Sequence, residues 1–242
     1  MDGDRYLDLY RRNLAHRAAA GGVRGRLEAW FRDRLDAKAR AEGQDDRHGL
    51  ALGRVLTLCG LAAPGPLTVL EIGAGDGLWL SHKRPDLRCI AIDNGTAFAD
   101  DFHRRGIAFH ARDVTREGLP LESAAADLVM MNHVIEHLPD PALVLAECQR
   151  VLRPGGALYL RTPDIARVGF AFYDDPTHVK PYTPTALEAT VRRFGFAPIF
   201  RHLTDTRRTN LDLLSDGRWR RWLLGSRFGG GEIEAGFRRE AG

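Results

Sequence analysis

The pattern that most constrains the fold is a series of short β-rich segments separated by helical or polar stretches. The series begins after Pro66, and its segments are Leu67–Ile72, Arg88–Ile92, Ile107–Ala111, Ala126–Met131 and Ala157–Thr162. Strands that alternate with helices form a parallel sheet that is covered on both faces. A nearly continuous apolar run such as Leu128–Met131 fits a central, buried strand. The sequence therefore predicts an α/β fold with a mostly parallel sheet.

Further elements are expected in the last third of the chain. Pro184–Phe194 predicts a helix that stops at Gly195, and Pro198–Leu203 and Ile233–Arg238 predict two more strands. Residues 204–231 are predicted to be an irregular insertion with one helical stretch around Leu213–Leu224.

The chain before the first strand is predicted to be helical. Apolar residues recur there at helical spacing, namely Leu27, Trp30, Phe31 and Leu35. A second run, Leu50–Leu58, continues the pattern up to Pro64-Gly65-Pro66. We expect residues 1–63 to form a helical extension or lid that packs on the sheet, and residues 64–242 to form the ligand-binding domain.

Composition excludes several classes of protein. With 44% hydrophobic residues among 242, the chain can bury a core, but no run approaches the roughly 20 apolar residues of a membrane-spanning helix. The first twenty residues carry many charges and no apolar core of a secretion signal. Cys59, Cys89 and Cys148 are odd in number and far apart, which argues against a disulfide framework or a zinc ribbon. We expect a protein of the reducing cytoplasm with no membrane partner.

The charge pattern does not favour nucleic acid as a partner. The formal net charge is +3, and a nucleic-acid surface needs a basic stripe with exposed aromatic residues. The densest basic region, residues 207–227, also contains Asp212 and Asp216. A solvated or substrate-facing helix is the favoured interpretation of that region.

A glycine-rich turn gives the strongest chemical signal. The first predicted strand continues into Glu71-Ile72-Gly73-Ala74-Gly75-Asp76-Gly77, and a helix is expected after it. Such a turn lets the backbone approach a ligand where side chains would collide. The spacing is G-x-G-x-G, with Leu78 at the position where a dinucleotide-binding motif has its third glycine, so a nicotinamide dehydrogenase is disfavoured.

Acidic residues follow the next two strands. Asp93 and Asn94 end the second strand, and a carboxylate there can accept hydrogen bonds from both hydroxyls of a ribose. Asp113, followed by Val114, comes after the third strand, where it would face an adenine. Each acid alone could cap a helix or end a turn. Together at successive strand tips they favour an adenosine-type ligand.

With these motifs, residues 65–203 resemble the class I S-adenosylmethionine-dependent methyltransferases, in particular the group of ubiquinone-biosynthesis, sugar and natural-product O-methyltransferases. The resemblance also rests on the segment Asn132–Pro141 and on Leu152-Arg153-Pro154-Gly155-Gly156 before a strand. It implies a Rossmann-like sheet of seven strands, one of them antiparallel. It also implies a set of residues that bind S-adenosylmethionine: Glu71, Gly73, Gly75, Asp93, Asn94, Asp113, Val114 and Asn132.

The expected reaction is an in-line methyl transfer from a sulfonium, with a base that removes the proton of the acceptor. Candidate bases are His133, after the fourth strand, and His178, in a polar loop at 174–182. Imidazole suits this role because its unperturbed pKa lies near 6.5.

A divalent metal is a further hypothesis, because four potential ligands could converge: His133, Glu136, His137 and His178. Related metal-dependent families have glutamate at the position of His133, and a mixed His and Glu set favours an ion softer than magnesium. The alternative is that Glu136-His137 only begins a helix.

The leading interpretation is an enzyme that methylates a hydroxyl of a small molecule, such as a sugar or a secondary metabolite. The alternatives are an RNA-terminal or nucleobase methyltransferase and a catalytically silent cofactor-binding scaffold. We also expect residues 1–63 and 204–231 to shape the pocket of the acceptor, because the cofactor motifs are complete without them.

Overall fold

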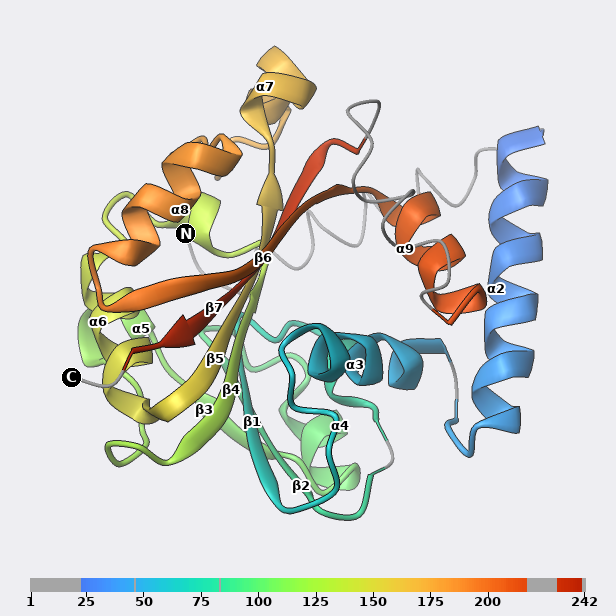
Figure 1. Ribbon diagram of the computed structural model, residues 1–242, viewed down its shortest axis with the longest axis horizontal. Coiled ribbons are helices and arrows are strands. Elements are labelled where there is room, and N and C mark those ends of the chain that lie inside the picture. Colours follow the sequence, from blue (N-terminus) through green and yellow to red (C-terminus); the bar gives the residue numbers. More distant parts are fainter. Residues whose placement is uncertain (1–22, 46, 83, 217–229, 241–242) are drawn as a thin grey trace.

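The computed structural model describes residues 23–240 except 46, 83 and 217–229, and its centre is a seven-stranded sheet (Figure 1). The strand order is β3-β2-β1-β4-β5-β7-β6. Every pairing is parallel except those of β7, which lies antiparallel between β5 and β6. The predicted α/β class, the seven strands and the single antiparallel strand are confirmed. The strands are β1 Leu67–Ile72, β2 Leu87–Asp93, β3 Ala108–Ala111, β4 Ala126–Asn132, β5 Leu152–Pro163, β6 Phe196–Thr204 and β7 Glu232–Arg239.

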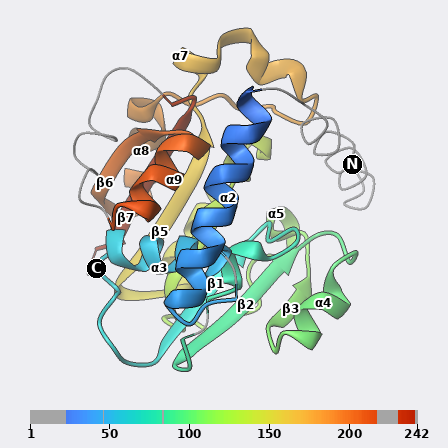
Figure 2. The same ribbon diagram turned by 90° about the vertical axis from the view of Figure 1, so that its right-hand side faces the viewer.

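Helices cover both faces of the sheet (Figure 1). On one face lie α5 Val114–Glu117, α6 Ala142–Val151 and α8 Pro184–Arg192. On the other lie α3 Arg47–Leu58 and α4 Ala99–Arg104, with α2 Val23–Ala41 and α9 Thr206–Leu214 further out. Figure 2 shows α2 crossing in front of α3 and α9, and it contacts both. The helices predicted before the first strand are thus present from residue 23; residues 1–22 of the predicted extension lie outside the described residues.

Successive side chains of the central strands point alternately into two hydrophobic cores, one on each face of the sheet. In β4, Leu128 and Met130 join the core under α3, while Val129 and Met131 join the core under α6 and α8. Successive side chains of a strand point to opposite faces, so a strand buried on both sides must be apolar throughout. This is why the run Leu128–Met131 marks the centre of the sheet.

The helix expected after the glycine-rich turn is not formed. The crossover from β1 to β2 contains only the 3₁₀ turn η1, Leu78–Leu80. Polar residues and Pro85 follow at once, and a proline disfavours helical geometry in the residue before it. The turn is therefore followed by an irregular stretch.

Two other boundaries differ from the prediction. The helix of the insertion spans Thr206–Leu214 instead of beginning near Leu213, because the Asp205 side chain caps it by accepting a hydrogen bond from the Arg208 amide at 2.9 Å. Residues 217–224 of the predicted stretch lie outside the described residues. β5 begins at Leu152, earlier than the predicted Ala157, because Leu152 pairs with Ala126.

None of the described helices is long and apolar enough to span a bilayer. All three cysteines are free thiols, and Cys59 and Cys148 are buried.

A buried network of charges joins the outer helices to the sheet. Arg54 of α3 donates to both carboxylate oxygens of Glu234 on β7, and its Nε donates to Asp212 of α9. The Tyr159 hydroxyl on β5 donates to Glu234 at 2.6 Å. Burial opposes the charge of Arg54, but attraction by Glu234 outweighs this and raises the pKa of the guanidinium. Glu234, buried but paired with Arg54, has its pKa lowered to about 2. Arg54 and Glu234 therefore keep their charges at all ordinary pH values.

We expect Arg54→Met to lower the free energy of unfolding by about 3 to 5 kcal/mol, because it leaves two buried carboxylates without their cation. Urea denaturation measures the loss. The matched control is Arg201→Met, which removes a pair with Glu188 at the surface and should cost about 0 to 1 kcal/mol. Equal losses in the two variants would contradict a special role for the buried network.

Candidate active site

The glycine-rich turn lies at the carboxyl end of β1, between two neighbouring segments. A Cβ atom at Gly73 would come within 2.4 Å of the Val134 side chain, and one at Gly77 within 2.0 Å of the Phe102 ring. Gly75 has a φ of 52° and no atom within 4 Å of where a Cβ would lie. The outer glycines therefore allow close packing, while the middle one leaves open space for a ligand.

Asp93 fastens this turn to the tip of β2. One carboxylate oxygen accepts from the Gly75 amide and the other from the Gly95 amide, both at 2.9 Å. A carboxylate has about four acceptor sites, so these two bonds leave capacity for ribose hydroxyls. Asn94, next to it, is exposed. Asp93 thus has a structural role in the turn beside the predicted role toward the ligand.

Glu71 and Asn132 form a buried polar pair at the ends of β1 and β4. Asn132 Nδ2 donates to Glu71 Oε1 at 2.8 Å. Two other buried oxygens of the pair, Glu71 Oε2 and Asn132 Oδ1, have no hydrogen-bond partner. Burial raises the pKa of Glu71 to about 8. The hydrogen bond from Asn132 lowers this pKa but does not offset burial, and the negative charges of Asp76 and Asp93 raise it further. When Glu71 is ionised, both of these oxygens are acceptors without a donor, and a bound cation would favour that ionised form.

Asp113 is placed after β3 as predicted, and it caps a helix. Its Oδ1 accepts from the amide and the hydroxyl of Thr115, at 3.0 and 2.6 Å. These bonds lower the pKa of Asp113. Val114 is buried against the core at the start of α5. A contact of Asp113 and Val114 with adenine stays a prediction.

His133 follows β4 directly and has both ring nitrogens next to carboxylates. Its φ of 53° is in the left-handed region, and its amide donates to the Arg161 carbonyl at 2.8 Å. Nδ1 lies 3.2 Å from Glu136 and Nε2 lies 3.5 Å from Glu232. Although the side chain is 41% exposed, its partial burial opposes protonation, and the hydrogen bonds to Glu136 and Glu232 outweigh this and raise the pKa of His133 to about 9. The imidazolium is therefore the main form at neutral pH.

Three of the four predicted metal ligands form a compact group. One ligand atom each of Glu136, His137 and His178 lies within 4.8 Å of the other two. The group joins the 3₁₀ turn η2, Ile135–His137, to the loop after η3, Gly169–Asp174. His137 Nδ1 bonds the Thr177 carbonyl at 3.0 Å, and His178 Nδ1 bonds the Phe172 carbonyl at 2.7 Å. With the proton of each ring on Nδ1, the lone pair of each ring is on Nε2. His133 lies outside this group.

Two charged residues of this site were missed by the sequence reasoning. Arg161 of β5 donates to Glu232 of β7 through Nε at 2.6 Å, and Glu232 in turn pairs with His133. Burial opposes ionisation of Glu232, but Arg161 lowers its pKa to about 2. The alternation of Tyr159 with Arg161, and of Glu232 with Glu234, on two apolar strands was the available signal, because charged side chains on an inward face need partners.

We expect the pKa of Glu71 to appear in the pH dependence of stability. Folding favours its protonated form, so the free energy of unfolding relative to Glu71→Gln should fall as the pH rises from 4.5 to about 8, by a few kcal/mol in total. Urea unfolding at several pH values measures this difference. Asp100→Asn, an exposed change on α4, is the control. A constant difference between wild type and Glu71→Gln would contradict the raised pKa.

The sequence of this chain is similar to those of known methyltransferases. A sequence model of the family described as "Methyltransferase domain" matches residues 33–199. The chain is 36% identical over 107 residues to a ubiquinone biosynthesis O-methyltransferase of Hahella chejuensis, covering 42% of this chain and 44% of that protein. It is 32% identical over 148 residues to a malonyl-[acyl-carrier protein] O-methyltransferase of Methylococcus capsulatus, covering 56% and 54%.

A solved structure agrees on the fold. The chain superposes on a SAM-dependent methyltransferase from Archaeoglobus fulgidus with a TM-score of 0.57 and 19% identity, covering 90% of this chain and 100% of that one. The chain spans only about a third to a half of the length of the first curated relatives it matches.

Proposed function

The chain belongs to the methyltransferase domain family, in the class I S-adenosylmethionine-dependent group, and on that basis we propose that it methylates a hydroxyl group of a small molecule. The observation on which the cofactor half of the proposal rests is the pair of unsatisfied buried oxygens, Glu71 Oε2 and Asn132 Oδ1. A primary ammonium group, such as that of the methionine part of the cofactor, supplies the donors and the positive charge that these atoms lack.

The other predicted contacts follow the strand tips. Asp93 would accept from the ribose, and the open space at Gly75 would admit the cofactor against the backbone. S-adenosylmethionine supplies an electrophilic methyl group on a sulfonium. The chain's own task is to hold the acceptor oxygen in line with that group and to take up its proton.

His178 has the geometry of a base. Its Nδ1 bonds the Phe172 carbonyl, so the lone pair lies on Nε2, 4.0 Å from Glu136. His133, the other predicted base, has both nitrogens engaged by carboxylates and is better placed to donate to an acceptor than to deprotonate it. Both residues lie beyond the carboxyl ends of the parallel strands, where open α/β sheets bind ligands.

The group of Glu136, His137 and His178 also fits a divalent ion. Its donor set is one carboxylate and two imidazoles that are each oriented through Nδ1 by a backbone carbonyl, as metal-binding histidines usually are. An ion there would act as a Lewis acid on the acceptor hydroxyl. In this version His178 is a ligand and not a base.

Residues 1–63 and 204–231 are proposed to shape the acceptor side. Support comes from Arg54 and Asp212, which fix α3 and α9 to the same sheet face as Glu232 and Arg161. The cofactor contacts, by contrast, all come from segments between β1 and α5 and from β4.

Cofactor binding is tested with Asp93→Ala. Calorimetry with S-adenosylhomocysteine should show affinity reduced at least about tenfold, because the change removes a ribose acceptor and also frees the turn. Asp100→Ala, an exposed acid nearby on α4, should bind normally. Normal binding by Asp93→Ala would contradict the assignment of this edge to the cofactor.

Transfer itself is tested with labelled S-adenosylmethionine and a panel of hydroxyl-bearing small molecules, with RNA in a parallel reaction. His178→Ala should lower turnover by about two to four powers of ten with cofactor affinity within a few fold. His103→Ala, an exposed histidine on α4, is the control.

Chelation separates the two versions of the site. If a metal takes part, a chelator abolishes activity and added divalent ion restores it; if His178 is the base, a chelator has no effect. Methylation of RNA alone would replace the proposal by the nucleic-acid alternative. Cofactor binding with no transfer to any acceptor would favour a silent scaffold.

A further inference from the structure

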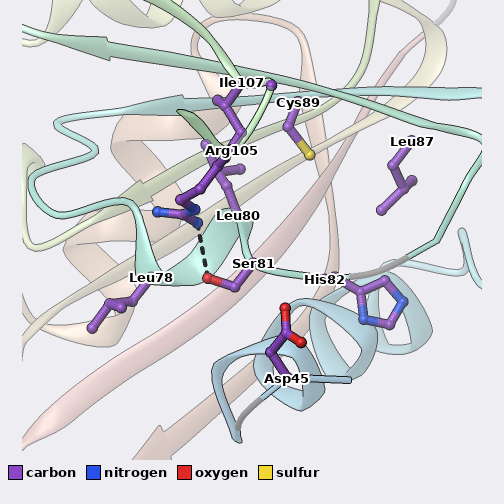
Figure 3. A pocket seen from close by; sticks show the side chains of 10 residues that line it. Asp45, Leu78, Leu80, Ser81, His82, Leu87, Cys89, Arg105 and Ile107 are labelled. Carbon is purple, nitrogen blue, oxygen red and sulfur yellow. Dashed lines mark hydrogen bonds between the residues drawn. The ribbon is translucent and has the colours of Figure 1, made fainter. Parts of the chain in front are cut away.

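A cavity of about 550 Å³ lies beside the start of β2 (Figure 3). It is bounded by the turn between α2 and α3, by η1, by the first half of β2 and by the turn between α4 and β3. Leu87, Cys89 and Ile107 form much of its apolar wall. Its volume is that of an ordinary small-molecule pocket.

The cavity exists because the crossover from β1 to β2 contains only a three-residue 3₁₀ turn and no α-helix. Parallel strands are usually joined by a helix that covers the sheet between them. Here η1 has only three residues, so Leu87 and Cys89, two residues apart on one face of β2, are only partly covered. Cys89 lies four residues before Asp93, about 13 Å along the strand. The β2 wall of the cavity is therefore remote from Asp93, whereas Leu78 and Arg105 bring the other side of the cavity next to the glycine-rich turn.

Arg105 connects the cavity to the glycine-rich turn. Its guanidinium lines the cavity and donates to the Asp76 carbonyl at 3.2 Å, the Gly77 carbonyl at 2.7 Å and the Ser81 hydroxyl at 2.8 Å. Among the residues that the structure describes, Arg105 makes no ion pair with a carboxylate. A guanidinium has five N–H donors and keeps its charge, so this cation can bind an anion from the cavity side.

We propose that this cavity binds a short-chain monocarboxylate, with its carboxylate on Arg105 and its aliphatic chain against Leu87, Cys89 and Ile107. A carboxylate that takes the remaining N–H donors draws the guanidinium toward the cavity and so weakens its bonds to the carbonyls of Asp76 and Gly77. Occupation therefore loosens the glycine-rich turn and weakens cofactor binding. This coupling rests on the proposed function, whereas binding in the cavity does not.

Asp45 places a negative charge on the side of the cavity opposite Arg105. Asp45 lines it from the turn between α2 and α3, whereas Arg105 enters from the turn between α4 and β3 (Figure 3). A carboxylate ligand is repelled by Asp45 and attracted by Arg105. The two side chains therefore predict opposite effects of neutralising substitutions.

Calorimetry with hexanoate and the protein without cofactor tests the site. We expect a dissociation constant on the order of 1 mM, with no measurable binding of hexanol or acetate, which lack the charge or the chain. Arg105→Gln should weaken binding at least about fivefold, and Asp45→Asn should strengthen it about twofold. Arg104→Gln, one residue away and exposed, is the matched control and should bind as wild type.

Two variants that fill the cavity locate the ligand. Cys89→Phe from β2 and Ile107→Phe from the other wall should each abolish hexanoate binding, and unfolding curves show whether each is folded. Normal binding by a folded filled variant, or equal binding of hexanoate and hexanol, would overturn the proposal.

The coupling between the cavity and the cofactor site is measured as the change in affinity for S-adenosylhomocysteine when hexanoate is bound. Saturating hexanoate should weaken it about three- to tenfold in wild type and leave it unchanged in a folded Cys89→Phe variant. Linkage requires the cofactor product to weaken hexanoate by the same factor. Hexanoate binding without any effect on the product would overturn the coupling. Failure of the product to bind at all would instead refute the proposed function, with the hexanoate titration still deciding the site.

Discussion

The pairing of Arg54 with Glu234 is the contact on which the arrangement of the outer helices depends. It joins α3 to β7, and through Asp212 it also holds α9, so that two segments far apart in the chain cover one sheet face. Charges buried to this degree are stable only when all of them are paired. These contacts fix the positions of α3 and α9 relative to β7, and β7 also provides Glu232 beside His133.

The candidate site divides between a rigid half and a polar half. On the cofactor side, Asp93 and the glycine-rich turn are fixed by backbone hydrogen bonds, and the unsatisfied atoms are the oxygens of Glu71 and Asn132. On the proposed acceptor side, His133 lies between the carboxylates of Glu136 and Glu232. A rigid cofactor half with a variable polar half lets one fold serve many acceptors, so fold alone does not determine the substrate.

Local patterns predicted most of the sheet, whereas contacts between distant residues were out of reach. β1 was predicted to the residue because apolar runs and glycines are local signals. The prediction of a helix after the glycine-rich turn was wrong because Pro85 disfavours helical geometry in the residue before it. The pairs of Arg54 with Asp212 and Glu234 join residues 158 and 180 positions apart, and no local pattern specifies such partners. For the same reason His133 was predicted at the site, but its pairing with Glu232 was not.

The antiparallel position of β7 has a consequence for synthesis on the ribosome. In the described sheet β6 is an edge strand whose backbone pairs with β7, and β7 is synthesised after β6 and the insertion that follows it. Until β7 has emerged, β6 exposes an unpaired edge, and Arg54 is without its buried carboxylate. A nascent chain generally folds from its N-terminal side, but here the last strand must insert between β5 and β6. β7 therefore joins the sheet by entering a gap between two strands that are both synthesised before it.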